Sequence, residues 1–189
     1  MTPSPRGRRY LHREQQIIEH ARQIAEREGW ASVTTRRLAQ EINHSQPVIY
    51  QHFRSRDHVL AAVVTQGFLE LTSLIREAAS GPGCALERLC WSYLDFGRQN
   101  PALYEAMFTN PTHLRFAQED TPAELRESFD ALTGIILQET GQMSNNDAAA
   151  LTELFWATCH GLTSLHLAGR IPGTHLEAQV KRICTMIRS

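Results

Sequence analysis

The stretch TTRRLAQEINHSQPVIYQHF, residues 34–53, joins two short helical patterns through a polar break. Thr34 is a favourable N-cap for the first helix. The break Asn43-His44-Ser45 contains an asparagine, which tolerates the left-handed backbone that a tight corner needs. Ser45 then caps a second helix of about seven residues, and Pro47 is acceptable in its first turn. This pattern predicts a helix-turn-helix.

Helical periodicity separates the inward-facing from the outward-facing positions of this segment. Leu38, Ala39, Val48 and Ile49 are the apolar anchors, and Ala39 is small where the two helices must approach closely. A seven-residue helix is only about 10 Å long, which adds little core but suits a DNA major groove. The alternative is a solvated helical hairpin with ordinary polar residues.

The outward-facing residue types fit nucleic-acid recognition. An arginine can bind guanine with two hydrogen bonds, and a glutamine can do the same with adenine. Hydroxyl, imidazole and guanidinium groups can bind phosphates, and so can the first turn of the following helix. The candidates for base reading are Arg36, Gln46 and Gln51, and those for phosphate contact are Thr35, Tyr50, His52 and Arg56.

The charge of the chain is distributed unevenly. Residues 1–60 hold ten arginines, no lysine and six acidic residues, which gives 10 − 6 = +4. Residues 61–189 hold nine basic and fourteen acidic residues, which gives 9 − 14 = −5. A basic N-terminal part and an acidic C-terminal part indicate that only the N-terminal part binds a polyanion.

The remaining sequence is helical in its periodicity throughout. Breakers such as Gly29 and Gly81-Pro82-Gly83 separate segments with apolar residues at helical spacing, and alternating β-type runs are absent from the sequence. We therefore expect an all-α protein of about nine helices. Their approximate ranges are 9–28, 34–42, 46–52, 56–79, 84–99, 101–109, 121–140, 147–169 and 174–188.

Other functional classes find little support. Cys84, Cys90, Cys159 and Cys184 lack metal-ligand spacing, so we interpret them as four mostly buried thiols and expect no metal and no cofactor. Cys159 and His160 are neighbours on a helix and point about 100° apart, which makes them a poor catalytic pair. We expect no membrane-spanning segment, because no apolar run approaches the required length, and a cytoplasmic, nucleoid-associated protein.

The segment SVTTRRLAQEINHSQPVIYQHFRSRDHVLAAV resembles the DNA-binding segment of the tetracycline-repressor (TetR) family, over about residues 9–65. The resemblance implies a DNA surface, with the base-reading and phosphate roles given above. Asn43 stands where the family usually has glycine, and Arg56 replaces a common lysine, which keeps the charge. The implied DNA surface consists of Thr35, Arg36, Gln46, Pro47, Val48, Tyr50, Gln51, His52 and Arg56.

The second half resembles one branch of the family's regulatory domains, through Trp156-Ala-Thr-Cys-His160-Gly161 and residues 100–108. That resemblance implies an effector cavity between helices, although each aromatic residue alone would be read as core. It also implies a homodimer through the last two helices, whose apolar stripes could instead be intramolecular core. The cavity candidates are Trp91, Phe96, Tyr104, Met107, Phe108, Phe129, Trp156 and His160.

These resemblances imply a ligand-responsive repressor that binds a palindromic operator as a dimer and is released by a small-molecule effector. A DNA-binding regulator without an effector, or an activator, remains an alternative; an enzyme is disfavoured because the sequence holds no catalytic motif. The expected organisation is a DNA-binding domain over residues 1–55 with a disordered basic arm at about 1–8, a connecting helix over 56–80, and a ligand-binding and dimerisation domain over 81–189.

Overall fold

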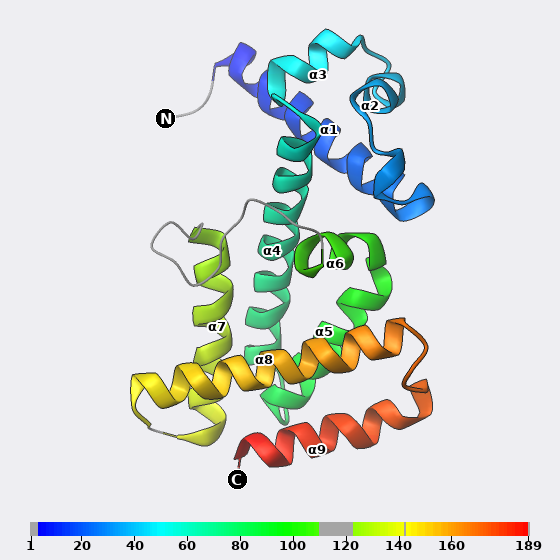
Figure 1. Cartoon of the computed structure of the whole chain (residues 1–189). Helices are drawn as coiled ribbons and strands as arrows, with labels where there is room; N and C mark the ends of the chain where they lie inside the picture. The colour runs from blue at the N-terminus through cyan, green and yellow to red at the C-terminus, as the bar shows by residue number, and fades with distance from the viewer. Residues whose placement is uncertain (1–3, 110–122, 142, 189) are drawn as a thin grey trace. The chain divides into compact units, whose positions relative to one another are not determined.

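The computed structural model describes residues 4–109, 123–141 and 143–188, which form nine α-helices and two short 3-10 helices (Figure 1). No strand occurs in these three ranges, which confirms the all-α prediction. The chain divides into two compact units, one of residues 1–67 with 102–115 and one of residues 68–101 with 116–189. The division therefore falls within α4 (Arg56–Ser80) rather than at either end of it.

The first helix of the N-terminal unit begins earlier than expected. α1 spans Pro5–Glu28, so the expectation of a disordered arm is wrong for residues 5–8. The side chain of Ser4 accepts a hydrogen bond from Gly7 N at 3.1 Å, and Pro5 occupies the first turn. A serine N-cap followed by proline is a strong helix start, because both satisfy or remove amides that lack an intrahelical partner.

The core of the N-terminal unit lies between α1 and the two short helices. Its fully buried side chains include Ile17, Ile24, Leu38 and Ile49, and Trp30 is buried as well. Gly29, with φ of 80°, ends α1 and turns the chain into this core, which only glycine does without strain. The remaining elements are η1 (Trp30–Ser32), α2 (Thr35–Glu41), α3 (Gln46–His52) and α6 (Pro101–Phe108).

Most of α6 belongs to the N-terminal unit, although it was expected in the C-terminal domain. The Glu26 carboxylate accepts hydrogen bonds from Ala102 N and Leu103 N, both at 3.0 Å. Trp30 Nε1 donates to Ala102 O at 2.7 Å. A carboxylate at the start of a helix satisfies amides that have no intrahelical partner. α6 is thus attached to the end of α1 and to η1.

Gly67 makes the contact between α4 and α6 possible. A Cβ atom at this position would lie 2.7 Å from Met107 Sδ and 2.9 Å from Leu103 Cδ1, closer than van der Waals contact allows. The sequence offers no periodicity signal for such a site, because a glycine inside a helix has no side chain to place in the apolar pattern.

The C-terminal unit is a bundle around α5. This helix packs against α7, α8 and α9 and buries Leu86, Leu89, Tyr93 and Leu94 among its core residues. α9 buries a stripe at helical spacing, as predicted from its sequence. The elements are α5 (Ala85–Gln99), α7 (Ala123–Thr140), α8 (Asn145–Leu167), η2 (Gly173–His175) and α9 (Leu176–Arg188).

α4 meets the length and composition of a membrane-spanning helix, with a mean hydropathy of 1.4 over its best window. An uninterrupted apolar run of that length is still absent from the sequence, and α4 meets the test only through the average over a window. A core helix satisfies the same test, and 44% of this window is buried inside the protein. Val63, Val64, Phe68 and Leu71 are among its buried residues.

Candidate nucleic-acid interface

The turn between α2 and α3 has the predicted helix-turn-helix geometry. Thr34 Oγ1 accepts a hydrogen bond from Arg37 N at 3.1 Å, which confirms Thr34 as the N-cap of α2. Asn43 has φ of 54° and is the one non-glycine residue with positive φ in the described ranges. His44 N donates to Ala39 O at 2.8 Å, which closes the corner. Asn43 therefore adopts the left-handed conformation of this corner, which a glycine would adopt at a lower conformational energy.

Ser45 stands at the N-cap of α3 but makes no side-chain capping hydrogen bond, so this detail of the prediction was wrong. A capping side chain binds the amide of the second or third helical residue. Here the second residue is Pro47, which has no amide hydrogen, and the amide of the third residue, Val48, donates to the backbone carbonyl of Ser45 at 3.0 Å instead.

The apolar anchors hold the two helices at a fixed separation. Leu38 and Ile49 are completely buried and Ala39 is 3% exposed, as expected for the small contact residue. Val48 is only half-buried, so it lies at the rim of this contact. The polar surface of α3 is therefore supported by a packed core rather than by a loop.

Most of the predicted DNA-contacting side chains are on the surface. Arg36, Gln46, Pro47, Tyr50 and Gln51 are exposed, and Thr35 is partly exposed. Thr35 Oγ1 and Tyr50 Oη lie 3.4 Å apart, which places a hydroxyl pair across the two helices. Tyr50 itself is 53% exposed, so its ring and hydroxyl group are open to a partner.

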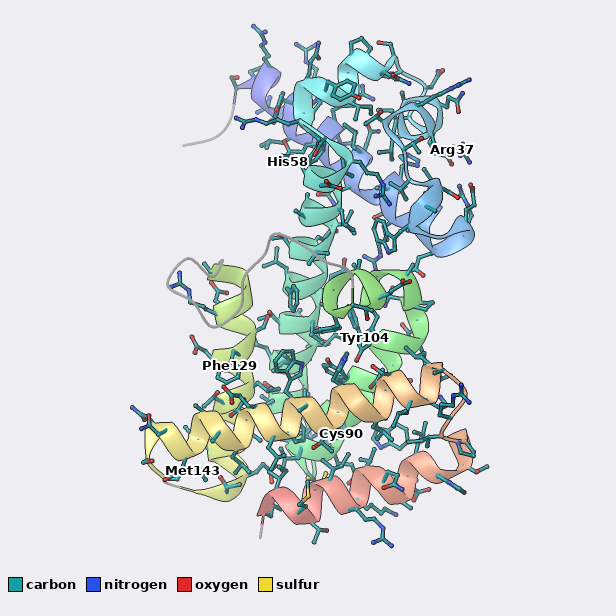
Figure 2. The ribbon with its side chains drawn as sticks, in the orientation of Figure 1. Arg37, His58, Cys90, Tyr104, Phe129 and Met143 are labelled. Atoms are coloured by element: carbon teal, nitrogen blue, oxygen red, sulfur yellow. The ribbon has the colours of Figure 1, made fainter. Side chains whose placement is uncertain are left out.

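The two adjacent arginines of α2 have different environments. Arg37, which is labelled in Figure 2, forms ion pairs with Glu41 at 2.6 Å and with Glu28 at 3.2 Å. Glu41 also pairs with Arg27, and this hydrogen bond is the main cause that holds the pKa of Glu41 below its ordinary value. Arg36 is exposed on the outer side of α2. Arg37 thus connects α2 to α1 and leaves Arg36 as the arginine that α2 presents to a partner.

Arg56 is held by the protein itself. Its Nε donates to Val33 O at 2.8 Å, and one Nη donates to Trp30 O at 2.6 Å. Both carbonyls belong to the segment that leads into α2. These contacts give the guanidinium a positioning role, because it joins the start of α4 to the entry of α2. Phosphate binding by Arg56 stays a prediction.

His52 lies against α1. Its ring centroid is 4.1 Å from that of Tyr10 with an interplanar angle of 33°, and Tyr10 Oη donates to Gln51 O at 3.1 Å. The Nδ1 of His52 is buried without a hydrogen-bond partner in the described part of the chain. Burial lowers the pKa of His52, so the ring is neutral at pH 7 and supplies no positive charge. The sequence pattern did not signal the Tyr10 contact, which spans 41 positions.

The cavity candidates are distributed over the two compact units. Tyr104, Met107 and Phe108 lie on α6, and Tyr104 and Met107 are buried residues of that helix. The C-terminal unit holds the other five, which are Trp91, Phe96, Phe129, Trp156 and His160.

Among those five, Trp156 Nε1 donates to Tyr93 Oη at 3.1 Å, a buried tyrosine that sequence reasoning had not selected. His160 Nε2 lies 3.4 Å from Ser164 Oγ, and burial lowers the pKa of His160. Trp91 lines a cavity of about 500 Å³ beside the turn between α4 and α5.

Two family models match this chain. Residues 17–63 match "Bacterial regulatory proteins, tetR family", and residues 86–187 match "Tetracyclin repressor-like, C-terminal domain". The HTH-type transcriptional regulator YobS of Bacillus subtilis (strain 168) is 25% identical over 151 residues, which cover 79% of this chain and 76% of that protein.

Solved structures share the fold. A protein of unknown function from Rhodococcus sp. RHA1 has a TM-score of 0.76 and 24% identity, with 93% of each chain covered. A transcriptional regulator of the TetR/AcrR family from Thermobifida fusca YX-ER1 has a TM-score of 0.67 and 18% identity, covering 94% of this chain and 97% of that one. With a helix-turn-helix that presents a polar face and family models over both halves, the chain belongs to the tetR family and is a DNA-binding transcriptional regulator.

Proposed function

We propose that this protein is a ligand-responsive repressor that binds a palindromic DNA operator as a homodimer. The surface of α2 and α3 is the observation that supports DNA reading in this proposal. Its polar side chains are exposed, while Leu38 and Ile49 beneath them are completely buried. A rigid support of this kind holds base-contacting side chains in place before DNA binds, which lowers the entropic cost of recognition.

Arg36, Gln46 and Gln51 read base edges in this proposal. They are exposed, and arginine and glutamine have the paired donors and acceptors that guanine and adenine require. Thr35 and Tyr50 contact phosphates through their hydroxyl groups. Pro47 and Val48 contribute apolar contacts at the groove.

We expect Gln46→Ala and Arg36→Ala each to lower affinity for the preferred sequence by about 5- to 150-fold, the range of one bidentate base contact. The operator is first obtained by selecting bound duplexes from a random-sequence DNA library with the purified full-length protein. Binding is then measured by fluorescence anisotropy at several salt concentrations. The matched control is Gln40→Ala, an exposed glutamine of α2 outside the assigned surface. Wild-type affinity in both variants would exclude this reading surface.

Tyr10 is expected to position the end of α3. Tyr10→Phe removes one hydrogen bond and keeps the ring against His52, so operator affinity should fall only by about two- to tenfold. Tyr10→Ala removes both contacts and should have a larger effect. The control is Leu11→Ala, the adjacent residue, whose side chain is 55% exposed. Operator affinity is measured with the same anisotropy assay. Equal affinity of Tyr10→Ala and the wild-type protein would rule out the positioning role.

The homodimer is supported by an apolar face on α8. Leu154 is 52% exposed and Leu165 47% exposed, and Gly161 lies between them at helical spacing. A Cβ atom at Gly161 would meet nothing within 4 Å, so no helix in the described parts of this chain packs closely against this glycine. We infer that a second copy covers this face, with α9 adding the exposed Met186.

Regulation by an effector is the further part of the proposal. The candidate binding groups are the aromatic residues and His160 of the C-terminal unit. α6 follows α5 directly in the chain and is hydrogen-bonded to Glu26 and Trp30 of the DNA-reading unit. In this proposal, a movement of α5 on effector binding is passed to the DNA-reading unit through α6. An effector that binds better to one arrangement of the two DNA-reading units shifts the dimer toward it, and separations other than about 34–36 Å lose contacts.

Repression itself is tested with a reporter gene. A promoter that overlaps the selected operator should be less active when the protein is co-expressed in bacteria, and the Gln46→Ala variant should restore activity. An increase of expression by the wild-type protein would instead identify an activator. A DNA-binding regulator of this family is expected in the cytoplasm, and we propose that it is associated with the nucleoid.

A further inference from the structure

All four cysteines of the chain lie together in the C-terminal unit. Cys84 is the N-cap of α5, Cys90 lies on α5, Cys159 on α8 and Cys184 on α9. Cys90 is labelled in Figure 2. Their positions in the sequence predicted four mostly buried thiols, and the fold brings together residues that are up to 100 positions apart.

The thiols lie close to one another. Cys90 Sγ and Cys159 Sγ are 3.5 Å apart. Arg188, one helical turn after Cys184 on α9, donates to Cys84 Sγ at 3.0 Å, which brings the end of α9 that carries Cys184 next to Cys84. In agreement with this, Cys184 and Cys84 each affect the pKa of the other. A disulfide has an S–S length of about 2.0 Å, so thiols in contact need only a small movement to become linked.

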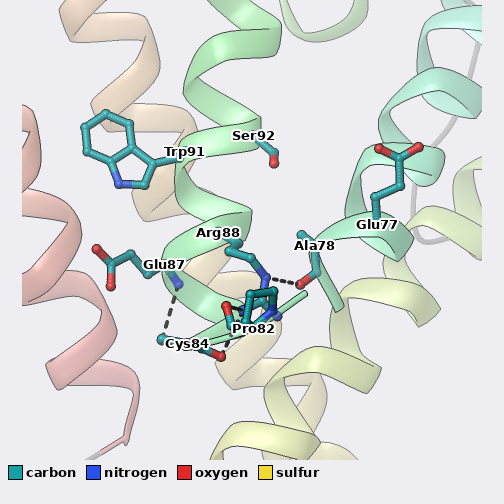
Figure 3. Close-up of a pocket in the computed structure, with 9 residues that line it drawn as sticks. Glu77, Ala78, Pro82, Cys84, Glu87, Arg88, Trp91 and Ser92 are labelled. Carbon is teal, nitrogen blue, oxygen red and sulfur yellow. Dashed lines mark hydrogen bonds between the residues drawn. The ribbon is translucent and has the colours of Figure 1, made fainter. Parts of the chain in front are cut away.

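Access to this cluster is restricted to one end. Cys90, Cys159 and Cys184 are 1%, 4% and 6% exposed, whereas Cys84 is half-buried. Cys84 also lines the cavity of about 500 Å³ (Figure 3), together with Pro82 and other residues of the turn after α4. A small dissolved reagent thus reaches Cys84 before the other three thiols.

The surroundings of Cys84 combine opposing effects. Its Sγ accepts hydrogen bonds from Glu87 N at 3.4 Å and from Arg188 Nη2 at 3.0 Å. Both donors stabilise a thiolate, as does a helix N-terminus. Burial has the largest effect and raises the pKa of Cys84, and the charges of Cys184 and Glu139 act in the same direction. The thiolate is consequently a minor species at pH 7 and increases with pH.

We propose that Cys84 is an oxidation site for hydroperoxides and that Cys184 is its resolving cysteine. The Cys84 thiolate attacks one oxygen of hydrogen peroxide, so an S–O bond forms, the O–O bond breaks, and the departing hydroxide takes up a proton to become water. Cys184 then loses its proton and attacks the sulfenic acid. The S–S bond forms, the S–O bond breaks, and a second water leaves.

The net reaction converts two thiols and one peroxide into one disulfide and two waters. It links the start of α5 covalently to α9. Because α9 contributes to the proposed dimer surface, oxidation is expected to alter DNA binding as well. That consequence rests on the proposed function, whereas the disulfide itself does not.

The experiment uses the full-length protein and hydrogen peroxide, with dimedone to trap sulfenic acid and iodoacetamide to block remaining thiols. Peptide mass spectrometry should find a Cys84–Cys184 disulfide in the wild-type protein. The Cys184→Ser variant should instead accumulate the dimedone adduct at Cys84, and Cys84→Ser should leave Cys184 reduced. The matched control is Cys159→Ser, which should still form the Cys84–Cys184 link. The rate should rise about tenfold per pH unit between pH 7 and 8.5, following the thiolate fraction.

A wild-type protein in which Cys84 is still fully alkylated after peroxide treatment would overturn the proposal. So would a disulfide that forms equally fast between other cysteines in Cys84→Ser. The wild-type result needs no variant, so it decides even where a substitution impairs folding. Oxidation that forms the disulfide in a protein without sequence-specific DNA binding would uphold this inference and exclude the proposed function.

Discussion

The double substitution Leu154→Glu with Leu165→Glu is expected to convert the protein from a dimer into a monomer. Both leucines are exposed on one face of α8, on either side of Gly161. Glutamates there would bring four like charges into the interface of two copies, and desolvation of each carboxylate adds to the repulsion. Sedimentation should then give the mass of the 21.4 kDa chain instead of twice that mass.

The same variant should lose at least about 100-fold in operator affinity, because a monomer keeps one half-site and approaches the range of non-specific binding. The matched control is Leu69→Glu, since Leu69 is a similarly exposed leucine on α4, at 48%. Helix content by circular dichroism should be unchanged in both variants, because the substituted side chains are on the surface. A double variant that still sediments as a dimer would place the interface elsewhere.

Arg56→Lys is expected to weaken operator binding about tenfold or more although the positive charge remains. Lysine cannot reproduce the two directed hydrogen bonds to Trp30 O and Val33 O, each of which contributes about 1.5–3 kcal/mol when the donor is charged. The entry of α2 should loosen as a result. Hydrogen exchange of the amides in η1 and at the start of α2 should therefore become faster.

Two outcomes separate this positioning role from a phosphate contact. If Arg56 only contacts a phosphate, lysine keeps that contact, so Arg56→Lys should have the affinity and the salt dependence of wild-type DNA binding. The positioning role predicts lower affinity and faster local exchange. Arg54→Lys is the matched control, because Arg54 is an exposed arginine two residues earlier, and it should behave as wild type in both measurements.

Much of this structure was predicted from local patterns in the sequence. Thr34 was predicted as an N-cap and accepts the expected hydrogen bond, and Asn43 adopts the left-handed conformation that the corner required. Leu38 and Ile49 were predicted as anchors from their spacing and are completely buried. Each of these features depends on residues within about four positions of one another, so the sequence pattern records it directly.

Other features escaped prediction because they depend on residues distant in the sequence. The stacking of Tyr10 on His52 joins α1 to α3, and Arg56 reaches back to two carbonyls more than 20 positions away. The assignment of α6 to the N-terminal unit is of the same kind, since Glu26 holds its first amides. A charged or aromatic side chain looks alike in a sequence whether it faces DNA or a neighbouring helix.

The sequence by itself determined the all-α class, the helix-turn-helix and the resemblance to its family, because helical periodicity, capping and turn residues act over one or two turns of chain. The tertiary structure decided which polar residues remain available to a partner. It assigned Arg37 and Arg56 to contacts within the protein and left Arg36, Gln46 and Gln51 exposed. It also gathered four scattered cysteines into one cluster, because packing α5 against α8 and α9 places their buried faces together.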